Sequence, residues 1–167
     1  EHSIFQAQLR LIRDYYGIGP GQIDQPAFPL FALFSTALGA TAVIPDMDPT
    51  RPAKVNPQKF VESIEKYGVT YSFGSPAIWN VISRYCGEKD RRLKTLNKVL
   101  MAGAPVSGEL IARMQKVLHP DARIHTPYGA TESLPIVSIE GEEIVGTTWQ
   151  YTRQGRGTCV GRPLPGI

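Results

Sequence analysis

Apolar residues recur along the chain at the three- and four-residue spacing of amphipathic helices, in segments that alternate with short β-branched and aromatic runs. Phe5, Leu9, Ile12 and Tyr16 form the first such stripe, and Gly17 ends it. The pattern predicts helices over 5–16, 30–38, 57–67, 76–85 and 108–118, a weakly helical segment over 142–154, and strands over 23–28, 41–45, 69–73, 98–102, 122–125 and 136–139.

The expected helix starts follow from capping chemistry. Asn56-Pro57 and Ser75-Pro76 each place a capping side chain before a proline at the first helical turn, and Ser107 can cap the helix that follows it. Segment 30–38 is apolar nearly all round, which predicts that this helix is buried.

Strands that alternate with helical segments of ten or more residues need crossover connections. The predicted fold is therefore α/β, a mainly parallel sheet with helices on both faces. In such a sheet ligands bind beyond the carboxyl ends of the strands. Two expected strands end at Gly103-Ala104-Pro105 and at Tyr128-Gly129-Ala130-Thr131-Glu132, so both segments are expected at one edge of the sheet.

Composition and charge narrow the class of protein. The 167 residues are 42% hydrophobic and 20% charged, which suits one globular domain with a real core. The basic stretch 89–94 has no aromatic residues between its charges, so a solvated loop is favoured over a nucleic-acid site. Two distant cysteines, no apolar run of membrane-spanning length and no recognisable signal peptide favour a cytoplasmic protein with no transmembrane segment.

Each candidate site residue has two interpretations. Tyr128 can stack on a purine or fill the core at a strand end. Gly103 either lets a flat base approach the backbone or serves only the turn, and Gly129 is expected in a turn in both cases. Thr131 can bind a phosphate or cap a helix, and Glu132 can hold Mg²⁺ or remain a solvated carboxylate.

Other chemistry finds little support in the sequence. The histidines and cysteines lack metal-ligand spacing, and there is no Gly-x-Ser-x-Gly elbow, Walker-type phosphate loop or Gly-x-Gly-x-x-Gly segment.

Three motifs in order resemble the adenylate-forming superfamily of AMP-dependent synthetases and ligases, which includes the acyl-CoA synthetases. They are Gly103-Ala104-Pro105, Tyr128-Gly129-Ala130-Thr131-Glu132 and Val160-Gly161-Arg162-Pro163-Leu164-Pro165-Gly166. Within this superfamily the chain most resembles the OleC branch of olefin biosynthesis, through residues 28–52 and 128–135. Phe28-Pro29-Leu30-Phe31 is similar to the acyl-pocket segment of the superfamily.

The resemblance implies that residues 1–167 are the central α/β part of the large domain of an adenylate-forming enzyme. Such an enzyme uses ATP and Mg²⁺ to convert a carboxylate, here a long-chain fatty acid, to an acyl-adenylate and pyrophosphate. The acyl group then passes to coenzyme A or, in the OleC branch, a β-hydroxy acyl-adenylate closes to a β-lactone. Other enzymes of the same pathway are the implied partners.

The same resemblance assigns roles to individual residues. Gly103, Ala104 and Pro105 would border the adenine, and Tyr128 would stack on it beside Gly129 and Ala130. Thr131 would bind the α-phosphate and Glu132 would hold Mg²⁺.

The phosphate loop of the superfamily is absent from the sequence, and the ribose-binding Asp, the hinge and the catalytic Lys are expected beyond Ile167. We therefore expect a single α/β subdomain, a fragment that is inactive alone. A non-catalytic nucleotide-binding module and an α/β interaction domain without nucleotide remain as alternatives.

Overall fold

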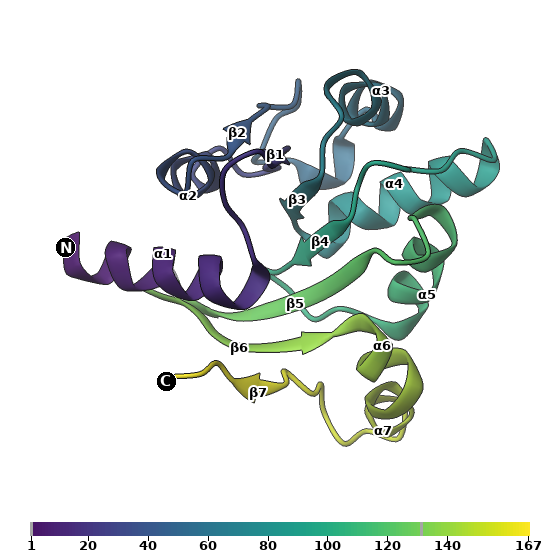
Figure 1. Cartoon of the computed structure of the whole chain (residues 1–167). Helices are drawn as coiled ribbons and strands as arrows, with labels where there is room; N and C mark the ends of the chain where they lie inside the picture. Colours follow the sequence, from purple (N-terminus) through teal and green to yellow (C-terminus); the bar gives the residue numbers. More distant parts are fainter. Residues whose placement is uncertain (1, 131) are drawn as a thin grey trace.

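A computed structural model describes residues 2–130 and 132–167 as one mixed sheet with helices on both sides (Figure 1). Thr131 and Glu1 lie outside the described residues. The elements in chain order are α1 (His2–Tyr16), β1 (Ile23–Asp24), α2 (Phe31–Ala37), β2 (Thr41–Ala42), the 3-10 turn η1 (Pro52–Lys54), α3 (Pro57–Tyr67), β3 (Tyr71–Gly74), α4 (Pro76–Glu88), β4 (Lys98–Met101), α5 (Gly108–Val117), β5 (Arg123–Ala130), β6 (Ser133–Glu140), α6 (Gly141–Glu143), the π-helical turn η2 (Ile144–Thr148), α7 (Trp149–Arg153) and β7 (Arg162–Pro163).

The sheet has the strand order β2-β1-β3-β4-β5-β6-β7. Strands β1 to β5 pair in parallel, whereas β6 pairs antiparallel with both β5 and β7. The predicted α/β class with a mainly parallel sheet is therefore confirmed. The antiparallel end gives the strand expected over 136–139 its two partners.

Alternate residues of β4 point to opposite faces of the sheet, and each face has its own core. Val99 and Met101 pack in a large cluster with residues of α3, α4 and α5, which we call the α3/α4/α5 face. Leu100 belongs to a smaller cluster with residues of α1 and α2, which we call the α1/α2 face. In Figure 1, α1 and α2 lie to the left of the strands and α3, α4 and α5 to the right.

Local sequence signals account for both ends of α3 and for the start of α5. The Asn56 side chain accepts a hydrogen bond from the Lys59 backbone N–H, and Ser107 accepts one from that of Leu110. Gly68 ends α3 in the left-handed conformation that glycine adopts at low cost. Ser75 occupies the expected cap position of α4, but its side chain makes no capping bond.

The burial expected for segment 30–38 is wrong. Helix α2 covers only Phe31–Ala37, with Ser35 as its buried residue, while Leu30 and Leu33 are more than half exposed. A single helix on one face of a sheet can bury one side only, so an all-round apolar sequence leaves part of itself uncovered. The segment expected as a strand over 23–28 is likewise reduced to the two residues of β1.

No helix in the described part of the chain combines the length and the apolarity needed to cross a bilayer.

Candidate functional site

A cavity of about 370 Å³, the large cavity, opens beyond the carboxyl ends of β4 and β5. This volume falls in the usual range of small-molecule sites. Its wall is made by four separate stretches of the chain, namely residues 101–106, 126–129, Ile144 with Thr148, Trp149 and Thr152, and residues 158–160. The two segments that the sequence placed at one edge of the sheet therefore meet here.

The turn Gly103-Ala104-Pro105 forms the first wall of the large cavity, and all three residues are exposed. Gly103 has φ of +91°, which L side chains rarely adopt, so the turn needs glycine. A Cβ at this position would meet no atom within 4 Å. The positive φ confirms that the turn needs glycine, and the open space beside Gly103 is compatible with a ligand there, so that interpretation stays a prediction.

Tyr128 forms the facing wall. It lies within β5, pairs with Val137 across the hairpin and is 57% exposed. This exposure excludes the interpretation of Tyr128 as a core residue. The ring is free to present its face to a planar ligand in the cavity.

The expectation of a turn at Gly129 is wrong. The motif lies within the antiparallel β5–β6 hairpin, where β5 extends to Ala130 and the pairing shifts between Tyr128 and Ala130. A Cβ on Gly129 would lie 2.4 Å from the carbonyl oxygen of Ser133. Glycine is needed here because the irregular pairing brings the opposite backbone close, not because of a turn.

Glu132 is exposed at the turn between β5 and β6 and does not line the large cavity. Ala130 is also exposed and lines a neighbouring cavity. Thr131, the predicted phosphate ligand, lies outside the described residues. Over 2–130 and 132–167 no three His, Cys, Asp or Glu side chains are grouped as a metal site. A single carboxylate is still compatible with Mg²⁺, which binds proteins through one or two carboxylates together with substrate phosphates.

The large cavity has a third wall that was not predicted from the sequence. Thr148, Trp149 and Thr152 come from the η2–α7 segment, and Cys159 lies in the extended stretch before β7. The Trp149 ring packs over Gly108, where a Cβ would lie 2.4 Å from its Cγ. This contact joins two segments about forty residues apart in the sequence, so no local pattern predicts it. The four-residue spacing of Thr148 and Thr152 indicates only that these two side chains share one face of a helix.

A second cavity of about 180 Å³, the aromatic cavity, adjoins the large one on the α1/α2 face. Phe28, Phe31, Phe34 and Phe73 dominate its wall, and Ala102, Gly103 and Gly129 line both cavities. Phe31 stacks on Phe73 with ring centroids 3.7 Å apart. The segment Phe28-Pro29-Leu30-Phe31 thus borders an apolar space that meets the large cavity at two glycines.

Two buried ionisable groups, Asp24 and His125, lie on the α1/α2 face. Burial raises the pKa of Asp24 to about 7, against an opposing hydrogen bond with Ser35. Burial lowers the pKa of His125 to about 4, with a further effect from the positive charge of Lys98.

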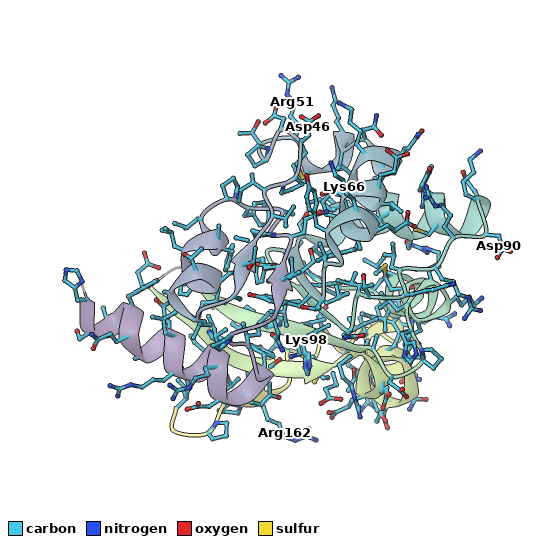
Figure 2. All side chains as sticks on the ribbon, turned by 45° about the horizontal axis from the view of Figure 1, so that its top comes forward. Asp46, Arg51, Lys66, Asp90, Lys98 and Arg162 are labelled. Carbon is cyan, nitrogen blue, oxygen red and sulfur yellow. The ribbon has the colours of Figure 1, made fainter. Side chains whose placement is uncertain are left out.

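Lys98 itself joins β4 to α1. Its half-buried ammonium donates to the Tyr16 carbonyl, and burial lowers its pKa. The Tyr16 hydroxyl donates to Ser138 Oγ at 3.1 Å, so α1 is also held to β6. Figure 2 shows Lys98 within the body of the molecule, whereas Asp46, Arg51 and Asp90 project at its edge.

Comparison with solved structures supports the fold. The chain is similar to the nonribosomal peptide synthetase FmoA3 in its α-methyl-L-serine-AMP bound form, with a TM-score of 0.78 and 19% identity. The match covers 96% of this chain and 18% of that one.

Curated relatives are closer in sequence. Over 160 residues the chain is 46% identical to an olefin beta-lactone synthetase of Stenotrophomonas maltophilia, which covers 96% of this chain and 28% of the relative. It is 30% identical over 103 residues to a long-chain-fatty-acid–CoA ligase of Thermus thermophilus, covering 62% of this chain and 17% of the relative. The chain thus spans less than a third of the length of these relatives.

The family comparison covers both predicted walls of the large cavity. Residues 27–167 match the model of the family described as AMP-binding enzyme. This range holds the Gly103 turn, the β5–β6 hairpin and the third wall contributed by η2 and α7. The chain therefore belongs to the AMP-binding enzyme family.

Proposed function

We propose that the complete gene product activates a long-chain carboxylic acid by ATP-dependent adenylation. The observation that carries this proposal is the contact between two cavities of different character. The large cavity has an exposed tyrosine and an open glycine turn, the aromatic cavity is apolar, and Gly103 and Gly129 line both. A nucleotide and an acyl chain bound in these spaces would meet at the two glycines.

The adenine would bind in the large cavity. Tyr128 stacks on its face, a contact worth on the order of 1–3 kcal/mol, and Gly103, Ala104 and Pro105 border it. Gly129 would border the nucleotide in the same cavity, and Ala130 follows it at the end of β5.

The phosphates would lie toward the hairpin turn, with Thr131 binding the α-phosphate. Glu132 would hold Mg²⁺, whose charge neutralises the phosphate oxygens. A carboxylate oxygen of the acid attacks the α-phosphorus, a new P–O bond forms, and the bond to pyrophosphate breaks. The protein contributes position and charge to this step.

The product would be a β-lactone or an acyl-CoA. In the first case the β-hydroxyl oxygen of the acyl-adenylate attacks its own carbonyl carbon and AMP leaves. In the second the sulfur of coenzyme A attacks the same carbon, the bond to the phosphate oxygen breaks, and AMP leaves. The 46% identity to an olefin beta-lactone synthetase favours the lactone route and a β-hydroxy acid as substrate. Action in the cytoplasm, alongside other enzymes of the same pathway, completes the proposal.

The test is ATP–pyrophosphate exchange by the complete gene product with long-chain fatty acids and their 3-hydroxy forms. We expect exchange with at least one of them. Glu132→Ala should lower Mg²⁺-dependent exchange by about a hundredfold or more, because the metal loses its protein anchor. Glu88→Ala, which removes an exposed carboxylate at the end of α4, is the matched control and should leave exchange unchanged.

Absence of exchange with every carboxylate would contradict the proposal. If calorimetry then showed that the protein still binds ATP, the chain would be a nucleotide-binding module without this chemistry.

A further inference from the structure

Among the described residues that line the aromatic cavity, Gln8 of α1 is the one with a polar side chain. Every other side chain there is aromatic or aliphatic, and two positions are glycine. Gln8 is only 6% exposed and lies in the buried stripe of α1 together with Ile12 and Tyr16. A primary amide loses its hydration in such a place, whereas leucine or methionine would fill it without that loss. A glutamine at this position therefore indicates hydrogen bonding, within the chain, to a ligand, or to both.

The packing of α1 on the β5–β6 hairpin shows where along the aromatic cavity Gln8 lies (Figure 1). Helix α1 contacts β6, and the Tyr16 hydroxyl donates to Ser138 Oγ at 3.1 Å. From Tyr16 back to Gln8 is about 12 Å along the helix, and from Ser138 back to Leu134 is about 13 Å along the strand. Gln8 and Leu134 both line the aromatic cavity, so helix and strand run in the same direction and these two residues lie at the same level.

Leu134 lies where the aromatic cavity meets the large cavity. A Cβ built on Gly129 would lie 3.2 Å from the Cα of Leu134, and Gly129 lines both cavities. Gln8 is therefore at the end of the aromatic cavity that adjoins the large one. Under the proposed function, this end holds the carboxylate and the first carbons of the acid.

The charge and hydrogen-bonding capacity of this wall indicate which substituent Gln8 can bind. No Lys, Arg or His is among the described residues that line the aromatic cavity, so a charged group on the chain would be left unpaired there. A neutral hydroxyl is different, because a primary amide offers it both an acceptor oxygen and N–H donors. Gln8 already has an interaction within the chain, but its two N–H donors and the two lone pairs of its oxygen exceed what one hydrogen bond uses.

We propose that Gln8 is a specificity-determining residue that binds the 3-hydroxyl of a β-hydroxy acid substrate. The proposal rests on the proposed function, because the acid must lie in the aromatic cavity with its carboxylate toward Gly129. The carbon that carries the hydroxyl is then only two bonds beyond the carboxylate carbon, at the end of the cavity where Gln8 lies. The amide does not titrate, so Gln8 orients the hydroxyl and takes no proton from it. An unsubstituted acid fills the same space without this contact.

The test compares 3-hydroxydecanoic, 10-hydroxydecanoic and decanoic acids in ATP–pyrophosphate exchange by the complete gene product. We expect the KM for the 3-hydroxy acid to be about tenfold below that for decanoic acid, the effect of one well-formed hydrogen bond, and no such gain for the 10-hydroxy acid. Gln8→Met keeps the length of the side chain and removes its amide. This variant should bring the ratio of the two KM values to about one, while the KM for decanoic acid stays within about twofold of its original value.

Gln6→Met changes an exposed glutamine of the same helix in the same way and is the matched control, which should leave the ratio unchanged. A purely structural glutamine would give a different result, since its loss would weaken the binding of both acids alike. Thermal unfolding should confirm that Gln8→Met is folded, and Gln8→Leu is a second variant without the amide. Loss of folding in both variants would assign Gln8 a structural role and overturn the proposal.

Three results would overturn the role of Gln8 and leave the proposed function standing. They are a preference for the 3-hydroxy acid that survives in Gln8→Met, an equal loss for the 3-hydroxy acid and decanoic acid, and an original chain that gains nothing from the 3-hydroxyl or gains as much from the 10-hydroxyl. Absence of exchange with every acid would instead contradict the proposed function itself, and the role of Gln8 with it.

Discussion

The two faces of the sheet differ in how completely they are packed. On the α3/α4/α5 face the large side chains of Ile64, Ile78, Trp79, Ile82, Ile111 and Met114 are fully buried. On the α1/α2 face Phe28, Phe31 and Phe34 are only partly buried, and two cavities, of about 180 and 30 Å³, lie beside them. The buried ionisable groups Asp24 and His125 belong to this second face.

This difference indicates a division of roles. A densely packed face contributes most of the free energy of folding, because each buried side chain loses contact with water and gains many close contacts. A loosely packed face leaves space that a ligand can occupy. The sheet between them allows one face to vary for binding without loosening the other.

The largest expected effect is on the packed face. Trp79→Ala should lower the free energy of unfolding by about 3–5 kcal/mol, because it leaves a cavity that the neighbouring side chains cannot fill. Leu33→Ala on α2, where the side chain is 56% exposed, should change it by less than about 0.5 kcal/mol. Urea denaturation measures both. Similar losses for the two variants would show that the faces do not differ as described.

The hairpin that joins the two cavities should respond to an added methyl group. Gly129→Ala places a Cβ against the Ser133 carbonyl and should lower the free energy of unfolding by about 1–3 kcal/mol, the usual range for overpacking. Gly146→Ala is the matched control, since its Cβ meets nothing within 4 Å and alanine favours a helical segment. If thermal unfolding shows the two variants to be equally stable, the close approach at Gly129 is not a constraint.

The smallest expected effects are on how the free energy of unfolding depends on pH, and they distinguish the contribution of Asp24 from that of His125. The pKa of Asp24 is raised in the folded state, so its contribution to stability is lost as pH rises from about 4 to about 7. The pKa of His125 is lowered, so its contribution is lost as pH falls from about 6.5 to about 4. Between these limits the two contributions oppose each other.

Single variants should expose each contribution. Relative to the original chain, Asp24→Asn should become less stable on acidification from pH 6 to pH 4.5, and His125→Gln more stable, each by up to about 1.4 kcal/mol per pH unit. Denaturant unfolding at several pH values checks this. Curves that run parallel to that of the original chain would show that neither group titrates differently in the folded state.

Much of the fold was predictable because the signals are local. The caps at Asn56 and Ser107 and the stop at Gly68 act within one helical turn, and the structure confirms all three. The meeting of the Gly103 turn with Tyr128 also followed from a general rule, that parallel strands end at the same edge.

The errors share a different cause, which is contact between distant segments. The need for glycine at position 129 depends on how β6 pairs with β5, and the third wall of the large cavity depends on Trp149 packing over Gly108. The exposure of α2 depends on what lies beside it and not on its own composition.

The two glycines shared by the cavities have a consequence for kinetics. Because Gly103 and Gly129 border both spaces, a side chain at either position changes the walls of both cavities at once. Under the proposed function, the KM for ATP and the KM for the acid of the complete gene product should therefore shift together in variants at these positions. Changing acyl preference without disturbing nucleotide affinity would have to start from the far end of the aromatic cavity, where only one substrate is in reach.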